Sequence, residues 1–190
     1  MEISEWKIRL DAQRQGKDRF FGQHWQSPIP SEERASFERL TYYPPDPDYR
    51  FELKLHEHGH KQIMKIEDTV GNIRSLIRWG EFRFKITGTE CVLQAYKSDS
   101  REERLFVPLR DATSGKETYN AGRYLDLDPE NHLTPEGKWI VDFNEVYNPF
   151  CAYSQAYACP FVPPENWLKV PVHAGEKDYV HKKQRRLTND

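Results

Sequence analysis

The sequence lacks long apolar runs, and it lacks an excess of charge of either sign. No apolar run approaches the roughly 18 residues that cross a bilayer, and the start, MEISEWKIRLDAQRQGKDRF, is too charged for a signal peptide. The 28 basic and 30 acidic side chains almost cancel, so there is no electrostatic reason to expect nucleic acid or an anionic membrane as a partner. We therefore expect a cytoplasmic protein with neither of these partners.

Cysteine is scarce, and internal repeats and low-complexity segments are missing. Three cysteines, an odd number, do not favour a disulfide framework in a reducing compartment. Cys151 and Cys159 lack the C-x2-C spacing of structural zinc sites. For this pair the sequence leaves four interpretations open: small buried hydrophobes, a thiolate nucleophile, a pair of metal ligands, or a local disulfide.

The length of the chain favours one structural domain. Its 190 residues suffice for one full core and are too few for two comfortable ones. Within this domain we expect an N-terminal helical segment and linker over residues 1–48 and a β domain with a long C-terminal proline-rich loop over 49–178. A basic tail over 179–190 is expected to be a solvated terminus without a function.

Two short helices are expected before residue 48. Ser4 can cap the first helix, which carries Trp6, Leu10 and Phe21 on one side and ends near Gly22. A second helix is expected in PIPSEERASFERL, with Ser31 as its N-cap and Glu32 and Glu33 at the positive end of the helix dipole. The prolines of YYPPDPDY then end helical structure, because proline removes an N–H donor.

From Tyr49 onwards the apolar pattern changes to that of strands. Apolar and polar residues alternate in YRFELKL and again in EFRFKIT. Further candidate strands are KQIMKIED, NIRSLIRW, CVLQAYK, RLFVPL, RYLDL and KWIVDF, with turns expected at Gly59, VGN, Gly80, TGTE and SDSREE. Short gaps between consecutive strands favour antiparallel pairing. The expected fold is mainly β: an antiparallel meander forming a sandwich or a partly closed barrel, with the two helices packed against it.

Three histidines in HEHGH would share one face of a continuing strand, because His56, His58 and His60 are spaced by two residues. Three imidazoles on one face can bind zinc or another transition metal. The same positions continue the polar face of the strand, so solvated side chains are the favoured interpretation. A metal site at these histidines or at the two cysteines is a weaker hypothesis, and no cofactor is assigned.

Residues 110–127, RDATSGKETYNAGRYLDL, form the first of two polar segments that indicate a site. Hydroxyl and carboxylate groups surround Gly115 and Gly122, and an arginine follows. Glycines allow backbone N–H groups to form an anion-binding concavity, and an arginine can hold a carboxylate or phosphate through two hydrogen bonds. The segment is neither a P-loop nor a dinucleotide fingerprint. Dense Ser, Thr and Asp also occur in purely structural turns, which stays an open alternative.

Residues 142–167 form the second polar segment, a long proline-rich loop. Its carboxylates and amides are suited to coordinating a hard cation, binding hydroxyl groups or acting as acid and base. Alternatively, they satisfy the backbone of an irregular loop. Long loops in compact domains are more often functional, which favours a site.

The stretches LFVPLRDATSGKETYNAGRYLDL, DFNEVYNP and CPFVPPEN carry a family resemblance, together with W-x-x-R and RFFG near the N-terminus. They resemble the signature of a prokaryotic family described as domain of unknown function 1684, over nearly the whole chain. Leu109 and Trp167 depart from that pattern. The resemblance implies no activity. It implies that both polar segments are marks of the family and that they meet in space.

We therefore expect a small-molecule site, enzymatic or not, where loop 110–127 faces loop 142–167 and accepts an anionic ligand. The candidate acids or bases are Asp142 and Glu165. The candidate ligand-binding residues are Asp111, Thr113, Thr118, Tyr119, Arg123, Asn144, Asn148 and Asn166, of which Arg123 would hold the anionic group. The alternative is a non-catalytic metal-binding or protein-interaction module whose polar loops are structural.

Overall fold

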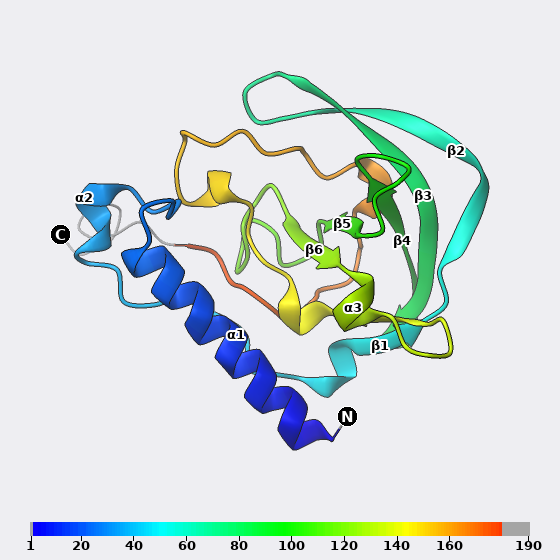
Figure 1. Ribbon diagram of the computed structural model, residues 1–190, viewed down its shortest axis with the longest axis horizontal. Helices are drawn as coiled ribbons and strands as arrows, with labels where there is room; N and C mark the ends of the chain where they lie inside the picture. The colour runs from blue at the N-terminus through cyan, green and yellow to red at the C-terminus, as the bar shows by residue number, and fades with distance from the viewer. Residues whose placement is uncertain (1, 180–190) are drawn as a thin grey trace.

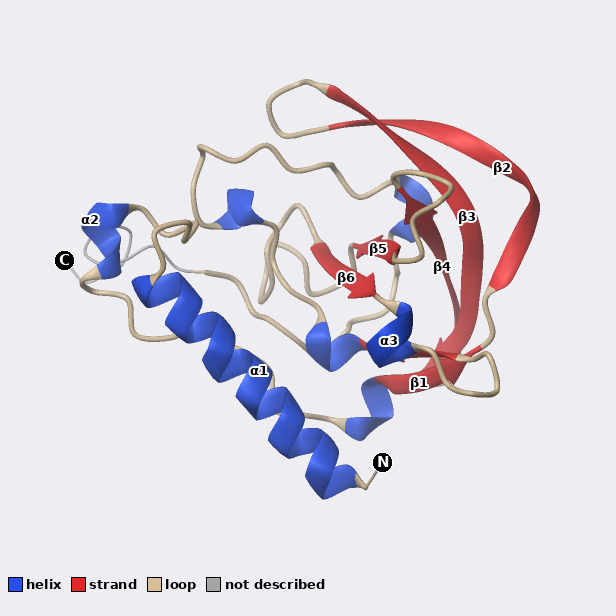
Figure 2. Ribbon diagram, in the orientation of Figure 1, coloured by secondary structure: helices blue, strands red, loops and turns tan. Residues whose placement is uncertain are grey.

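Most of the regular structure is a five-stranded antiparallel sheet whose strands neighbour one another in chain order (Figures 1 and 2). A computed structural model of the chain describes residues 2–179. Apart from residue 179, the predicted basic tail over 179–190 lies outside the described residues. The strands of this sheet are β2 (His56–Glu67), β3 (Ile73–Ile86), β4 (Thr89–Lys97), β5 (Leu105–Leu109) and β6 (Arg123–Leu127). The predicted mainly-β antiparallel meander is therefore confirmed.

A separate two-stranded sheet joins distant parts of the chain. Strand β1 (Arg50–Leu53) pairs antiparallel with β7 (Trp139–Asp142), with Arg50 opposite Asp142. Within residues 2–179 the two sheets are not closed into a barrel. The sequence predicted both strands, β1 from alternation and β7 as the candidate strand KWIVDF, but it did not indicate that β1 pairs with β7 instead of with its neighbour in the chain.

Two predicted turns are wrong, because the strands continue through both glycines. Strand β2 runs through Gly59, and β3 runs through Gly80. The register is irregular at each glycine. It shifts between Glu57 and Gln62 in the pairing of β2 with β3, and between Arg78 and Gly80 in the pairing of β3 with β4. The result is one long, curved hairpin of β2 and β3, at the right of Figure 1.

The first helix is longer than expected. Helix α1 spans Ile3–Gln23, and Glu2 occupies the N-cap position without a side-chain hydrogen bond, so the predicted Ser4 cap is wrong. The predicted inner side is confirmed, since Trp6, Leu10 and Phe21 are buried. Helix α2 is a single turn, Ser31–Arg34, and follows Pro30 instead of a serine cap. A third short helix, α3, spans Pro129–His132.

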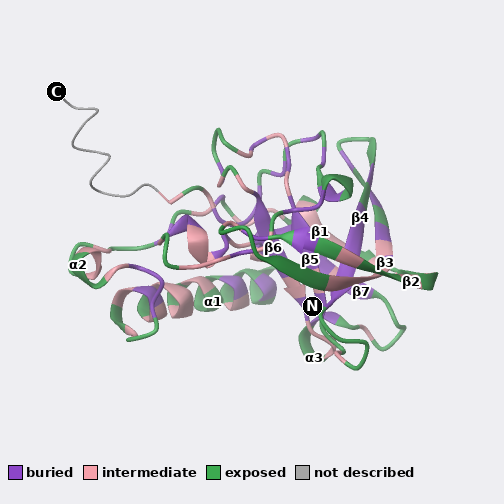
Figure 3. Ribbon diagram, turned by 90° about the horizontal axis from the view of Figure 1, so that it is seen from above, coloured by how far each residue is buried: buried purple, intermediate pink, exposed green. Residues whose placement is uncertain are grey.

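Helix α1 is joined to the β part of the molecule by a buried hydrogen bond. The indole Nε1 of Trp6 donates to Oδ2 of Asp142 at 2.6 Å, at the end of β7. The helix buries one side and exposes the other, as the burial colours of Figure 3 show. Within residues 2–179, no helix is long and apolar enough to cross a membrane.

Residues 142–167 are mostly irregular, as expected, and contain three short 3-10 helical turns. These turns are η2 (Phe143–Glu145), η3 (Phe150–Ala152) and η4 (Pro164–Asn166). The segment also contributes to the core. Phe143 packs with the strands, while Ala152 and Tyr153 join Phe21 of α1 in a second apolar cluster. The chain between η2 and η3 therefore lies beside α1, and the pocket described below is found there.

Candidate functional site

Arg123, the expected anion clamp, is fully buried and forms an ion pair with Asp111 at 2.9 Å. Its guanidinium also donates to three backbone carbonyls, those of Val172, Ala174 and Glu176. All of these partners belong to the protein, and the side chain exposes no surface to a ligand. Arg123 therefore fastens the C-terminal segment 172–176 to β6, and its geometry does not match the expected role of binding an anion.

The other polar groups of loop 110–127 are also engaged with one another. One carboxylate oxygen of Asp111 accepts hydrogen bonds from the backbone and hydroxyl of Thr113 and from the backbone of Val172. The hydroxyls of Thr113 and Thr118 lie 2.8 Å apart. The hydroxyl of Tyr119 contacts the sulfur of Cys151 at 3.7 Å. These contacts match the structural alternative for this loop.

The two candidate acid–base residues do not share a site. Asp142 is fully buried and accepts hydrogen bonds from Trp6 and Asn144. Burial raises the pKa of the Asp142 carboxyl. Glu165 instead accepts a hydrogen bond from the Tyr96 hydroxyl at 3.0 Å. Asp142 and Glu165, the two candidate acids or bases, have no common hydrogen-bond partner among the described residues.

Asn166 and Asn148 take the place of missing backbone partners. Strands β4 and β5 pair through a single residue pair, which leaves backbone groups of Gln94 and Pro108 without ladder partners. The Asn166 amide accepts from the N–H of Gln94 and donates to the carbonyls of both residues. The Asn148 amide donates to the carboxylate of Glu176 and to the carbonyl of Lys177. Both asparagines are fully buried.

The predicted candidate metal ligands, three histidines and two cysteines, are not gathered into a group of three within residues 2–179. Among residues 2–179, no three His, Cys, Asp or Glu side chains are grouped so that they could hold a metal ion. His58 turns to Gln94, with 2.7 Å between Nε2 and Oε1, while His56 and His60 are exposed on β2. Cys151 and Cys159 lie next to each other but have no third ligand of this kind.

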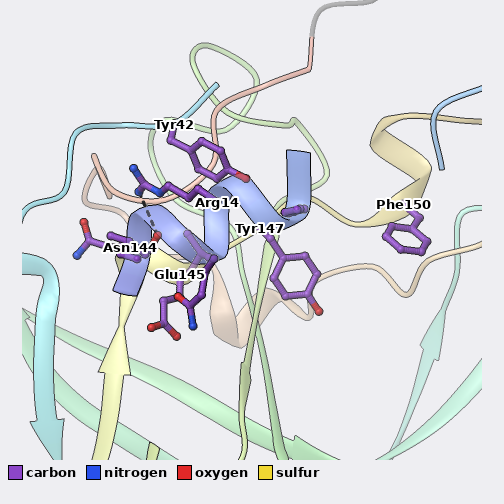
Figure 4. A pocket seen from close by; sticks show the side chains of 10 residues that line it. Arg14, Tyr42, Asn144, Glu145, Tyr147 and Phe150 are labelled. Carbon is purple, nitrogen blue, oxygen red and sulfur yellow. Dashed lines mark hydrogen bonds between the residues drawn. The ribbon is translucent and has the colours of Figure 1, made fainter. Parts of the chain in front are cut away.

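A pocket of about 350 Å³ lies between α1, the extended segment around Tyr42 and the chain from η2 to η3 (Figure 4). Asn144 is the expected ligand-binding residue that lines it. Its lining residues are Leu10, Gln13, Arg14, Lys17, Tyr42, Asn144, Glu145, Val146, Tyr147 and Phe150. The pocket therefore uses part of the predicted loop 142–167, and its other wall is the N-terminal helix instead of loop 110–127.

Arg14 is the central polar side chain of this pocket. Its guanidinium donates to the carbonyls of Tyr43 at 3.0 Å and Asn144 at 3.3 Å, and its carbon Cζ lies 4.4 Å from the centre of the Tyr42 ring. Within the described part of the chain, no carboxylate lies within 4.0 Å of it, and Nε has no hydrogen-bond partner. Burial lowers the pKa of Arg14, and the nearby carboxylates of Asp11, Asp142 and Glu176 offset part of that effect.

Each other charge at the pocket has an opposite charge beside it. Lys17 contacts Glu176 at 2.6 Å, and Glu176 is only 1% exposed because Asn148 and Tyr153 also surround its carboxylate. Glu145 lies 3.5 Å from Arg9 and accepts a hydrogen bond from His132. Arg14 is therefore the pocket cation without a carboxylate in direct contact within residues 2–179, although the charges of Asp11, Asp142 and Glu176 act on it from further away.

Aromatic rings form much of the remaining wall. Tyr42, Tyr147 and Phe150 line the pocket, and the ammonium of Lys17 lies 5.1 Å from the centre of the Tyr147 ring. Burial raises the pKa of both Tyr42 and Tyr147, so the phenols stay protonated. The Tyr147 hydroxyl donates to Asp126. The Tyr42 hydroxyl is buried and has no hydrogen-bond partner within residues 2–179.

The cations of this pocket were missed although the sequence contained a signal for them. Arg14 and Lys17 are half-buried and lie on the same side of α1 as the buried Trp6, Leu10 and Phe21. The steps from Trp6 through these positions to Phe21 are four, four, three and four residues. Two cations in the middle of an apolar stripe must meet either buried acceptors or a ligand. Only the stripe's apolar members were recognised from the sequence.

Comparisons with known proteins give a family and a fold. The family model described as "Protein of unknown function (DUF1684)" matches residues 35–177 and leaves out α1. None of the curated proteins matches the chain. The solution NMR structure of an uncharacterised protein from gene locus rrnAC0354 of Haloarcula marismortui is similar, with 40% identity and a TM-score of 0.71. That similarity covers 94% of this chain and 97% of the other.

Proposed function

Since the chain belongs to the DUF1684 family of proteins of unknown function, we propose a function from its site: a small-molecule-binding protein whose ligand enters the pocket between α1 and residues 144–150. The ligand has an anionic group, a carboxylate or a phosphate, and a flat apolar part. The observation that carries the proposal is Arg14, a half-buried guanidinium that has no carboxylate within 4.0 Å in residues 2–179.

The electrostatics of the pocket favour an anion. A half-buried cation without a carboxylate in direct contact retains part of its desolvation cost, and an anionic ligand would reduce that cost. The guanidinium is suited to a carboxylate or phosphate because its donors match the geometry of these groups. Two of its donors already point at carbonyls of Tyr43 and Asn144, which hold the side chain in place before a ligand arrives. A held side chain loses less entropy on binding.

The size and lining of the pocket fit a small molecule with a ring. A volume of about 350 Å³ lies within the range of ligand pockets, which combine apolar walls with a few polar groups. Tyr42 and Tyr147 line the pocket, and the Tyr42 ring lies beside the guanidinium of Arg14. If the protein also converts the bound molecule chemically, Glu145 is the residue that would transfer a proton. Glu145 lines the pocket and is oriented by its hydrogen bond with His132.

Binding of benzoate and phenyl phosphate, measured by calorimetry and by thermal shift, tests the proposal. We expect saturable binding by the wild-type protein and at least a tenfold loss in Arg14→Gln, because a hydrogen bond to a charged group contributes about 1.5–3 kcal/mol. Arg19→Gln, on the exposed side of the same helix, is the matched control and should bind like the wild type. The proposal fails if neither probe binds, or if Arg14→Gln binds both probes as tightly as Arg19→Gln does.

We place this activity in the cytoplasm and assign it no nucleic-acid or membrane partner. The near-neutral formal charge of -2 gives no electrostatic reason to expect nucleic acid or an anionic membrane as a partner. Cell fractionation with an antibody against the native protein tests it, and recovery in the membrane or exported fraction would contradict it.

A further inference from the structure

Cys151 and Cys159 form a pair of adjacent thiols outside the pocket. The backbone N–H of Cys151 donates to the sulfur of Cys159 at 3.4 Å. Both are free thiols, as is Cys91. They lie in a small cluster with Tyr124 and Val162. Loop 142–167 therefore brings together two sulfurs that are separated by seven residues in the chain.

The backbone around both cysteines is held in place. The N–H of Cys159 donates to the Thr69 hydroxyl, and the N–H of Thr69 donates to the carbonyl of Cys159, so this residue is tied to the turn after β2. Cys151 lies within the 3-10 turn η3, which is closed by the bond from Ala152 to Pro149. Two fixed attachment points keep the sulfurs together, which favours disulfide formation when an oxidant is present.

The surroundings of the two sulfurs make them chemically unequal. The hydrogen bond from the Cys151 thiol lowers the pKa of Cys159 and raises that of Cys151. Arg74, which donates to the carbonyl of Ala158, also favours a thiolate at Cys159. A thiolate is the nucleophilic form of cysteine. Cys159 therefore has the character of the attacking sulfur, and Cys151 that of the resolving sulfur.

A metal pair is the less supported use of these thiols. Structural zinc and similar ions take four ligands, and no third His, Cys, Asp or Glu joins these two within residues 2–179. A purely structural role as small hydrophobes explains the burial of Cys159, which is 8% exposed, but it does not explain why Cys151 is partly exposed and why the two sulfurs meet.

We propose that Cys151 and Cys159 are a redox-active pair that reduces a hydroperoxide and closes to a reversible disulfide. The Cys159 thiolate attacks the peroxide: an S–O bond forms, the O–O bond breaks, and the leaving oxygen takes a proton and departs as water or an alcohol. The Cys151 sulfur, after losing its proton, attacks the sulfenic acid: an S–S bond forms, and the S–O oxygen leaves as water. The two thiols together lose two electrons, and these two electrons reduce one peroxide. This chemistry does not depend on the ligand pocket.

Oxidation of the wild-type protein by one equivalent of hydrogen peroxide tests the proposal. Free thiols are then blocked with an alkylating reagent, and the intact mass and a peptide map are recorded. We expect the protein to lose two of its three alkylatable thiols and two hydrogens in mass, with a peptide crosslink between Cys151 and Cys159 that dithiothreitol reverses. If all three thiols remain alkylatable, or if oxygen is added without this crosslink, the proposal is overturned.

Single-cysteine variants test the order of the two steps. Cys91→Ser removes the third, buried thiol on β4 and should form the same crosslink. Cys151→Ser should stop at the sulfenic acid of Cys159, which dimedone traps. Trapping on Cys151 in the Cys159→Ser protein instead, with none on Cys159, would overturn the assigned roles. The wild-type peptide map decides the existence of the pair even if a variant does not fold.

Discussion

Arg123 and Asp142 show how single charged residues are used in this protein. Each is fully buried, and each satisfies its charge and hydrogen-bonding groups mainly with protein partners. Burying a charge is tolerated when it is paired and hydrogen-bonded, and removing one partner of such a pair is costly. The contacts of both residues tie distant segments together. By contrast, Arg14 reaches the interior without a carboxylate partner within residues 2–179, which is why the proposed site is placed there.

His132 should make stability depend on pH. Burial disfavours its charged form, but the hydrogen bond to Glu145 and the nearby Asp128 outweigh burial and raise the pKa of His132 above 6.5. The stabilisation is therefore fully present below about pH 6.5 and is lost as the pH rises through the raised pKa. We expect His132→Gln to cost about 1 kcal/mol or more at pH 5.5 and less at pH 8.5, as measured by urea unfolding.

The matched control for His132 is His60→Gln, because His60 is exposed on β2. Its unfolding free energy should stay within about 0.5 kcal/mol of the wild-type value at both pH values. A loss in His132→Gln that is equal at pH 5.5 and pH 8.5 would show that protonation of His132 does not contribute to stability.

At the scale of elements, the β2–β3 hairpin depends on one close backbone approach. A Cβ at Gly80 would lie 2.8 Å from the carbonyl oxygen of His56 and 3.0 Å from Cα of Glu57. Both atoms belong to the neighbouring backbone, so the strands would have to move apart. We expect Gly80→Ala to lower the free energy of unfolding by about 1–3 kcal/mol, which is the range of overpacking substitutions. Denaturant unfolding of the variant and the wild type measures this difference.

Gly59→Ala is the control on the same hairpin. A Cβ at Gly59 meets no described atom within 4 Å, and alanine costs less chain entropy than glycine on folding. The variant should therefore be as stable as the wild type or slightly more stable. Equal destabilisation by both substitutions would mean that glycine is required for strand conformation in general and that the close approach at Gly80 is not decisive.

At the scale of the whole molecule, α1 is required by the β part of the protein. Removing it would leave Asp142 without Trp6 and Glu176 without Lys17, and would open the cluster around Phe21. Breaking a buried pair costs about 3–5 kcal/mol, and the total stability of a domain is only about 5–15 kcal/mol. A chain that begins at residue 35 should therefore lose its cooperative thermal transition and its near-ultraviolet circular dichroism.

Adding a peptide of residues 1–27 in trans provides the control for this truncation. If α1 acts through its contacts, the peptide should restore part of the near-ultraviolet signal at high concentration. A truncated chain that melts cooperatively at the wild-type temperature without the peptide would contradict the requirement for α1.

The features predicted correctly from the sequence are those that depend on neighbouring residues. Alternation over β1 and β3 and the short gaps between strands were enough for an antiparallel meander, and the spacing of Trp6, Leu10 and Phe21 was enough for the buried side of α1. The polar loops were found as segments. Their role was not found, because the sequence cannot distinguish an arginine that meets carbonyls of residues 172–176 from one that meets a ligand.

The sequence by itself determined the mainly-β class, most strand positions and the polar segments, because hydrophobic period and turn residues act over a few positions along the chain. Only the tertiary structure decided that β1 pairs with β7, that Arg123 is enclosed, and that α1 meets residues 144–150 around a pocket. These outcomes join residues that lie from several tens to more than a hundred positions apart in the chain. The tertiary structure decides them because one arrangement of the chain must satisfy its buried charges and backbone groups together.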